Sequence, residues 1–120
     1  MNKIIKLKEN RDFRRAYTRG ASLVSPYFVV YYTKGRKNYV RLGITAGKKV
    51  GGAVCRNRAK RVITAAFRGC LPNIKEGYDF VIVARTRILS VKSTVVMASL
   101  LKLLKKADLC CELQDENSIN

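Results

Sequence analysis

Histidine is absent from the 120-residue sequence, and carboxylates are scarce, with 8 Asp and Glu residues against 25 Lys and Arg residues. The most common general base and zinc ligand is therefore missing. Before residue 108 the carboxylates are limited to Glu9, Asp12, Glu76 and Asp79. Their spacing indicates neither an acid/base pair nor a metal-binding cluster for phosphodiester hydrolysis. We expect no catalytic residues and no metal ligands in this chain, and we interpret Asp12 and Asp79 as structural.

Paired cysteines and long apolar runs are also missing. Cys55, Cys70, Cys110 and Cys111 form no CxxC motif, which argues against a zinc site and favours reduced thiols. No apolar run has the length of a membrane span, and the N-terminus lacks the apolar core of a signal peptide. We therefore predict a cytoplasmic protein without a membrane partner.

Positive charge dominates what is present, because the formal net charge is +17. Half of the acidic residues lie close to the C-terminus, at Asp108, Glu112, Asp115 and Glu116. The length predicts a single domain, residues 1–109, followed by a flexible acidic tail over 110–120, where hydrophobic periodicity is lost. The positive charges of the domain repel one another, which implies a polyanionic partner. Nucleic acid is the most common such partner, and an anionic membrane surface is the second.

Residues 48–68 combine a glycine turn with a strongly basic helix. Apolar residues recur at i, i+3, i+4, i+7 and i+8 and predict one buried face, formed by Ala59, Val62, Ile63, Ala66 and Phe67. The opposite side collects the polar and basic residues Asn57, Lys60, Arg61, Thr64 and Arg68, and the first turn carries Arg56 and Arg58. Free N–H groups, the helix dipole and guanidinium groups all suit phosphate oxygens. The alternative is a solvated basic helix, but no acidic residue occurs from Phe13 to Arg68, so we favour anion binding.

Residues 11–19 are predicted to form a first helix, with Asn10 as its N-cap and Gly20 as its stop signal. One face of this helix carries Phe13, Ala16 and Tyr17, at the i, i+3, i+4 spacing. The other side carries the four cations Arg11, Arg14, Arg15 and Arg19.

Three segments have the composition of strands. Residues 27–33 and 39–45 are rich in β-forming residues and flank a short turn, which predicts a hairpin. The apolar run 78–84 predicts an interior strand that pairs in parallel with the segment near 40–45. Ser90 is predicted to cap a final helix over 91–107. The resulting element order is αββαβα, an α+β arrangement in two layers.

The basic stretch resembles the Arg-Asn-Arg signature region of the bacterial ribonuclease P protein family. The similarity rests on residues 48–51, 53–61 and 66–68, and it continues into the third predicted strand at 78–85. The first helix and hairpin also match, through Leu7, residues 9–13, Tyr17, Gly20, Phe28, Val29, Tyr31 and Gly43. Gly52 and Thr64 depart from the pattern, since the family usually has Asn and a basic residue there.

This resemblance implies both a fold and an activity. The fold is a two-layer sandwich like the second domain of ribosomal protein S5, with a left-handed βαβ crossover that handedness rules alone would reject. The activity is that of a catalytic RNA, which removes the 5′ leader of precursor tRNA with Mg²⁺ and which the protein assists. The resemblance implies that the RNA subunit and substrate hold the Mg²⁺ and form the active site. The expected partners are the catalytic RNA and precursor tRNA, with no obligate protein partner.

The resemblance also assigns residues to two RNA sites. The RNA subunit is expected to contact Arg56, Asn57, Arg58, Lys60, Arg61 and Arg68. The single-stranded leader is expected in a cleft between the first helix and the sheet, at Phe13, Tyr17, Tyr31 and Lys49. From the residues alone, Phe13 and Tyr17 are more typical of core packing, because aromatic residues at i and i+4 usually face the interior. The resemblance favours base stacking instead.

A ribosomal or other structural RNA-binding protein is the alternative reading, because it would share the charge and the sandwich fold. It would differ in having no effect on leader cleavage. An autonomous nuclease would need a carboxylate cluster that the sequence does not indicate.

Overall fold

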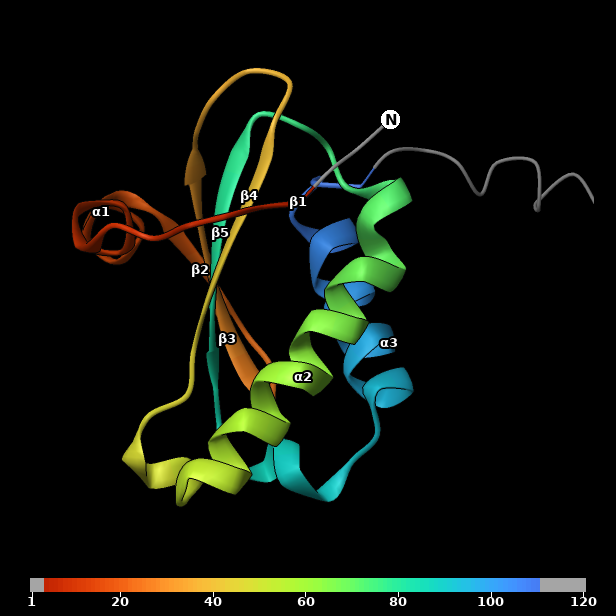
Figure 1. Ribbon diagram of the computed structural model, residues 1–120. Helices are drawn as coiled ribbons and strands as arrows, with labels where there is room; N and C mark the ends of the chain where they lie inside the picture. The colour runs from red at the N-terminus through yellow and green to blue at the C-terminus, as the bar shows by residue number, and fades with distance from the viewer. Residues whose placement is uncertain (1–3, 111–120) are drawn as a thin grey trace, which may run out of the picture.

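A five-stranded mixed sheet forms the centre of the protein, and the computed structural model describes residues 4–110 (Figure 1). Its strands lie in the order β1-β4-β5-β3-β2. Their bounds are β1 Ile4–Lys6, β2 Ala21–Val24, β3 Phe28–Lys34, β4 Val40–Thr45 and β5 Tyr78–Ala84. β4 pairs in parallel with β1 and β5, whereas β3 pairs antiparallel with β5 and β2. β5 therefore lies in the middle of the sheet, as its apolar run predicts.

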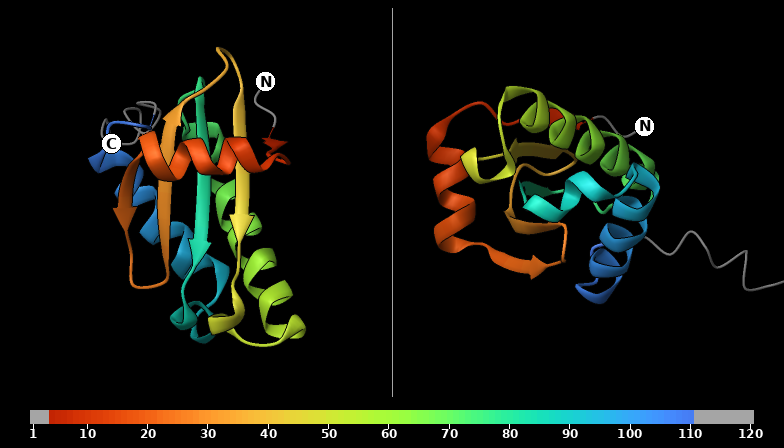
Figure 2. Two further views of the ribbon diagram at one scale, coloured as in Figure 1. Left: turned by 90° about the vertical axis from the view of Figure 1, so that its left-hand side faces the viewer. Right: turned by 90° about the horizontal axis from the view of Figure 1, so that it is seen from below.

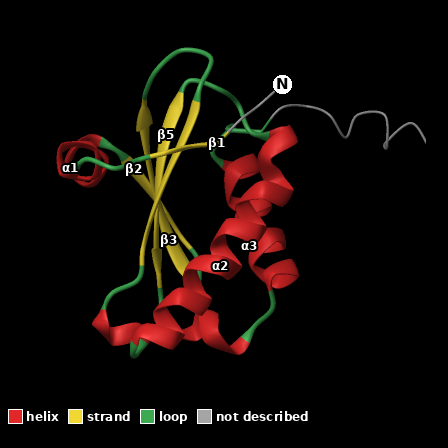
Figure 3. Ribbon diagram, viewed as in Figure 1, coloured by secondary structure: helices red, strands yellow, loops and turns green. Residues whose placement is uncertain are grey.

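Helices cover both faces of the sheet, but unequally (Figures 1 and 3). α2 (Ala53–Cys70) and α3 (Ser93–Lys106) pack on one face, and α1 (Asn10–Arg19) crosses the other (Figure 2). Short 3-10 helices form at η1 (Lys48–Val50), η2 (Leu71–Asn73) and η3 (Thr86–Ser90). The predicted α+β class is confirmed. Its two main layers are the sheet and the α2/α3 pair, and α1 adds a partial third layer.

The two faces carry separate hydrophobic clusters. The larger lies between the sheet and α2 and α3, and it includes the fully buried side chains of Phe28, Phe67, Phe80, Ile82 and Leu104. The smaller lies under α1, where Leu7, Ala16 and Val81 are buried and Phe13, Tyr31 and Val83 pack against them. α3 faces the larger cluster with Val96, Leu100 and Leu104, which are buried.

The connection from β4 through α2 to β5 is a parallel βαβ unit. In the left view of Figure 2, β4 and β5 both point downward, β5 lies to the left of β4, and α2 passes behind the sheet. The crossover is therefore left-handed, contrary to the usual rule.

The predicted hairpin between residues 27–33 and 39–45 is wrong. β5 lies between β3 and β4 and pairs with both strands. The segment before β5 enters between them, because the Gly35 N–H donates to the Gly77 carbonyl (2.9 Å) and the Gly77 N–H donates to the Tyr39 carbonyl (2.8 Å). Gly77 has φ = 94°, a conformation that favours glycine.

The short edge strands β1 and β2 are absent from the predicted element order. Three caps also differ from their predictions. Glu9 rather than Asn10 occupies the N-cap of α1, and Gly20 is extended (φ = −82°) rather than left-handed. Gly20 is needed for space, since a Cβ there would lie 2.4 Å from the Ala16 carbonyl oxygen. Ser90 ends η3, and α3 begins only at Ser93, with Lys92 as its N-cap.

No disulfide joins the cysteines within residues 4–110. Burial, with a smaller contribution from Cys110, raises the pKa of the Cys70 thiol to about 12, so this thiol stays protonated near neutral pH. Cys110 itself is buried and forms a β-bridge with Ile74, so it belongs to the folded domain rather than to the predicted tail. The rest of that tail, residues 111–120, lies outside the described residues. Within residues 4–110, no helix is long and apolar enough to span a membrane.

Candidate RNA-binding surfaces

The basic helix α2 begins after a turn that requires glycine. Gly51 has φ = 139°, a backbone conformation that residues with a side chain rarely adopt, and a Cβ on it would lie 2.9 Å from the Cys55 Cβ. Gly52 is the N-cap and contributes no side chain, so the first turn of α2 is open toward solvent. This arrangement explains Gly51, whereas Gly52 has an ordinary φ of −72° and open space around it.

The predicted buried face of α2 is confirmed at four of its five positions, and Val62 is half-buried. Ala59, Ile63, Ala66 and Phe67 are buried, and the Phe67 ring meets the Phe80 ring of β5 at a centroid distance of 5.6 Å. The basic side chains are thereby fixed on a helix that packs rigidly against the sheet.

The polar side chains of α2 point toward two different parts of the molecule. Lys60, Thr64 and Arg68 face the β1–β4 edge of the sheet and line one cavity. Arg58 and Arg61 face the start of α3 and line a second groove. Arg56 is half-buried and Asn57 exposed, both in the first turns of α2. α2 contains no acidic residue, so nothing on the helix itself offsets these cations.

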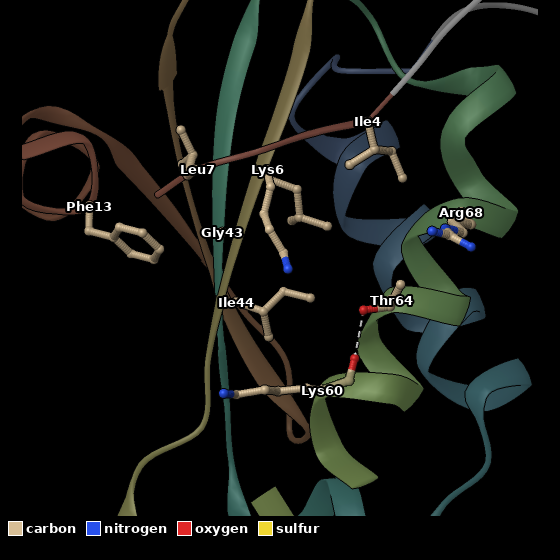
Figure 4. Close-up of a pocket in the computed structure, with 10 residues that line it drawn as sticks. Ile4, Lys6, Leu7, Phe13, Gly43, Ile44, Lys60, Thr64 and Arg68 are labelled. Carbon is tan, nitrogen blue, oxygen red and sulfur yellow. Dashed lines mark hydrogen bonds between the residues drawn. The ribbon is translucent and has the colours of Figure 1, made fainter. Parts of the chain in front are cut away.

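The first cavity has a volume of about 350 Å³ (Figure 4). It is lined by Ile4, Lys6, Leu7, Phe13, Leu42, Gly43, Ile44, Lys60, Thr64 and Arg68. β1 pairs only with the first half of β4, so the edge of β4 from Gly43 onward is open, and the cavity lies around that edge. Figure 4 shows Phe13 on one side of β4 and Lys60 reaching toward β4 from the other. The cavity thus joins residues that the sequence assigns to two different RNA sites.

Phe13 is neither fully core nor fully exposed. Its ring lies directly over Gly43, since a Cβ on Gly43 would come within 2.5 Å of the Phe13 Cζ. The side chain is half-buried and also lines the cavity. The absence of a side chain at Gly43 is therefore what allows the ring to rest at the sheet edge.

Tyr17 and Tyr31 form an aromatic pair beside Phe13. Their ring centroids are 5.0 Å apart in an edge-to-face arrangement, and Tyr17 is 42% exposed. The pair does not line the cavity. Lys49, the fourth predicted leader residue, is exposed in η1, beyond the end of β4 and also outside the cavity. The structure therefore places Phe13 and the basic helix around one cavity, whereas Lys49 lies outside it, in the 3-10 helix that precedes α2.

A buried ion-pair network holds α1 against the sheet, and no local sequence pattern indicates it. Arg41 on β4 donates to both carboxylate oxygens of Asp79 on β5, from Nε at 2.8 Å and from Nη2 at 2.7 Å. The same Nη2 lies 3.6 Å from Asp12 on α1, and Arg15 lies 3.5 Å from Asp12. The Asp79 hydrogen bond is the main cause that raises the pKa of Arg41.

These carboxylates are engaged in structure rather than in a metal site. Asp12 and Asp79 are both buried, and both face Arg41. A magnesium ion needs several unpaired oxygen ligands, and residues 4–110 contain no group of three or more potential metal ligands. The donor set of the described chain therefore does not fit Mg²⁺.

Comparison with known proteins places these features in one family. Residues 1–108 match the Ribonuclease P family. The chain is 37% identical over 107 residues to the Ribonuclease P protein component of Caldanaerobacter subterraneus, covering 89% of this chain and 92% of that protein. It is 42% identical over 103 residues to that of Clostridium botulinum, covering 85% and 93%.

Solved structures show the same fold. The RNase P protein from Thermotoga maritima superposes with a TM-score of 0.75 at 36% identity, covering 84% of this chain and 96% of that chain. The Staphylococcus aureus RNase P protein superposes with a TM-score of 0.72 at 33% identity, covering 89% and 98%. With a family match along nearly the whole described chain, this chain belongs to the ribonuclease P protein family.

Proposed function

We propose that this protein is the protein subunit of a bacterial ribonuclease P, in which it binds the catalytic RNA and the 5′ leader of precursor tRNA. The observation that carries the proposal is the cavity at the open edge of β4. There an aromatic ring, Phe13, and two cations of the basic helix, Lys60 and Arg68, line one cavity from opposite sides of β4. Stacking on a ring combined with phosphate contacts is how proteins hold single-stranded RNA without reading its sequence.

The basic helix suits the catalytic RNA. Its cations extend in two directions from one rigid helix, and the carboxylates of α1 and β5 are engaged by Arg41. Guanidinium groups form paired hydrogen bonds with phosphate oxygens, so Arg56, Arg58 and Arg61 are suited to hold a folded RNA backbone.

The leader suits the α1 side of the sheet. Phe13, Tyr17 and Tyr31 lie in succession along the contact between α1 and the sheet, so an unpaired strand can pass from ring to ring. Lys49 lies beyond the end of β4, where it can contact a phosphate of a strand leaving the rings. The chemistry of cleavage and the Mg²⁺ ions then belong to the RNA subunit, because the described carboxylates are ion-paired or isolated.

Reconstitution tests this proposal. The purified protein should stimulate cleavage of precursor tRNA by a bacterial ribonuclease P RNA at low magnesium, and the protein alone should cleave nothing. If the protein binds RNA but leaves the cleavage rate unchanged, it is a structural RNA-binding protein instead. Cleavage by RNA-free protein, purified until its activity is constant, would contradict the assignment of chemistry to the RNA.

The salt dependence of RNA binding tests the basic helix separately. With about five to eight phosphate contacts, the logarithm of affinity should fall with the logarithm of salt by roughly 0.7–0.9 per contact. Arg58→Ala or Arg61→Ala should each weaken binding and reduce that slope by about one unit. Arg36→Ala, at the exposed turn before β4, is the matched control and should leave the slope unchanged. Filter binding across salt concentrations measures all three; equal slopes would remove α2 from the interface.

A further inference from the structure

The second groove on the basic helix includes residues from outside it. It lies between α2 and the start of α3 and is lined by Arg58, Arg61, Val62, Ala65, Lys92 and Ser93. Arg58, Arg61 and Ala65 follow one stripe of α2, at i, i+3 and i+7. Lys92 faces this stripe from the other helix, so three cations surround an apolar floor.

The two walls of the groove are held rigidly. α2 and α3 pack so closely that a Cβ on Gly69 would lie 2.3 Å from the Met97 Sδ. Lys92 is fixed at the N-cap of α3, where its carbonyl accepts hydrogen bonds from the N–H groups of Val95 (3.0 Å) and Val96 (3.3 Å). The packing of α2 on α3 and these N-cap hydrogen bonds therefore set the position of the Lys92 backbone relative to Arg58 and Arg61.

The charges of the groove are not compensated within the protein. Among residues 4–110, neither Arg58, Arg61 nor Lys92 makes a side-chain hydrogen bond or an ion pair, and no carboxylate lines the groove. Three like charges held around one groove repel one another unless an anion lies between them. A solvated helix surface usually mixes charges of both signs, which this groove does not.

We infer that this groove binds the phosphodiester backbone of the catalytic RNA, with Lys92 and Ser93 extending the contact from α2 onto α3. The inference rests on the proposed function, because the occupant is the same RNA that Arg58 and Arg61 hold. Lys92 supplies an ammonium group and Ser93 a hydroxyl group to phosphate oxygens on the α3 side of the groove. The apolar floor of Val62 and Ala65 offers no base-specific contact, so the groove reads the backbone and not the sequence.

Charge removal at Lys92 tests the groove. Lys92→Gln should weaken binding of the ribonuclease P RNA and reduce the salt slope by about 0.7–0.9, the value for one phosphate contact. Lys102→Gln is the matched control, because Lys102 is an exposed lysine of the same helix, about 14 Å along its axis from Ser93. The control should keep the wild-type slope. Equal slopes for Lys92→Gln and Lys102→Gln would overturn the inference.

A carboxylate placed in the groove gives a second measurement. Ser93→Glu should weaken RNA binding more than Thr94→Glu, because Ser93 lines the groove and exposed Thr94 does not. Both changes put an acidic residue in the first turn of α3, where it is favourable, so both variants should fold. Equal affinities for the two variants would contradict the groove.

Arg58→Gln, measured in the same titration, distinguishes a failure of the groove inference from a failure of the proposed function. If Arg58→Gln weakens binding while Lys92→Gln and Ser93→Glu do not, the groove inference fails and the proposed function stands. If no variant weakens binding, the groove inference fails and Arg58 does not contact the RNA, and the reconstitution of cleavage then decides whether the proposed function stands.

Discussion

Replacing Arg41 by methionine should lower the free energy of unfolding by about 3–5 kcal/mol, because it leaves the buried carboxylate of Asp79 without a partner. Asp79 is 1% exposed, and each of its two carboxylate oxygens accepts a hydrogen bond from Arg41. For a domain of this size, such a loss should lower the melting temperature by roughly 10–25 °C. Thermal or urea unfolding of the purified variant measures it.

Two further variants isolate the ion pair. Arg36→Met removes an arginine from the exposed turn before β4. Within residues 4–110 the Arg36 side chain forms no ion pair, and its Cζ lies 5.8 Å from the centroid of the Tyr39 ring, so this change should alter stability by less than about 0.5 kcal/mol. Adding Asp79→Asn to Arg41→Met should restore part of the lost stability, because the buried group is then neutral. A full loss in the double variant, equal to the sum of the single losses, would show that Arg41 and Asp79 act independently.

The Arg41 network also explains how α1 is placed. One guanidinium contacts Asp79 on β5 and Asp12 on α1, so it fixes the helix that carries Phe13 relative to the sheet. The sequence indicates a structural role for both aspartates but not their common partner. Residues 12, 41 and 79 are far apart in the chain. The parallel pairing of β4 with β5 places Arg41 opposite Asp79, and the packing of α1 on the sheet adds Asp12.

Local pattern was sufficient for the basic helix. Its apolar spacing predicted the buried face of α2, and the glycines before it predicted the turn. Local pattern failed for the sheet, because the turn at residues 34–38 resembles that of a hairpin although β5 separates the two strands. Strand order depends on long-range pairing, and a central apolar strand such as β5 can pair along both of its edges.

The joining of the two predicted RNA sites was equally hidden from sequence. Phe13 reaches the cavity because its ring rests on Gly43, a residue 30 positions later in the chain. The three-residue strand β1 leaves the end of β4 open, and it has no clear sequence signal. A glycine inside a strand does indicate close approach by another group, and here that group is the Phe13 ring.

Phe13→Ala should weaken the affinity of the holoenzyme for precursor tRNA by about 1–3 kcal/mol, roughly 5- to 150-fold, because one leader base loses the Phe13 ring on which it stacks. Affinity for leaderless tRNA should stay nearly unchanged. The ring is half-buried, so the variant should also lose some stability, but less than the 3–5 kcal/mol typical of a fully buried Phe. Affinity for substrates with and without a leader, together with thermal melting, measures both effects.

Phe13→Leu distinguishes stacking from packing. Leucine retains much of the apolar volume over Gly43 but has no ring, so this variant should melt close to the wild-type temperature and still lose leader-dependent affinity. If Phe13 acts only through packing, Phe13→Leu should bind both substrates normally, and Phe13→Ala should weaken both substrates equally as its melting temperature falls. That result would leave the cations of α2 as the part of the RNA interface that the structure supports, and it would move the leader away from the open edge of β4.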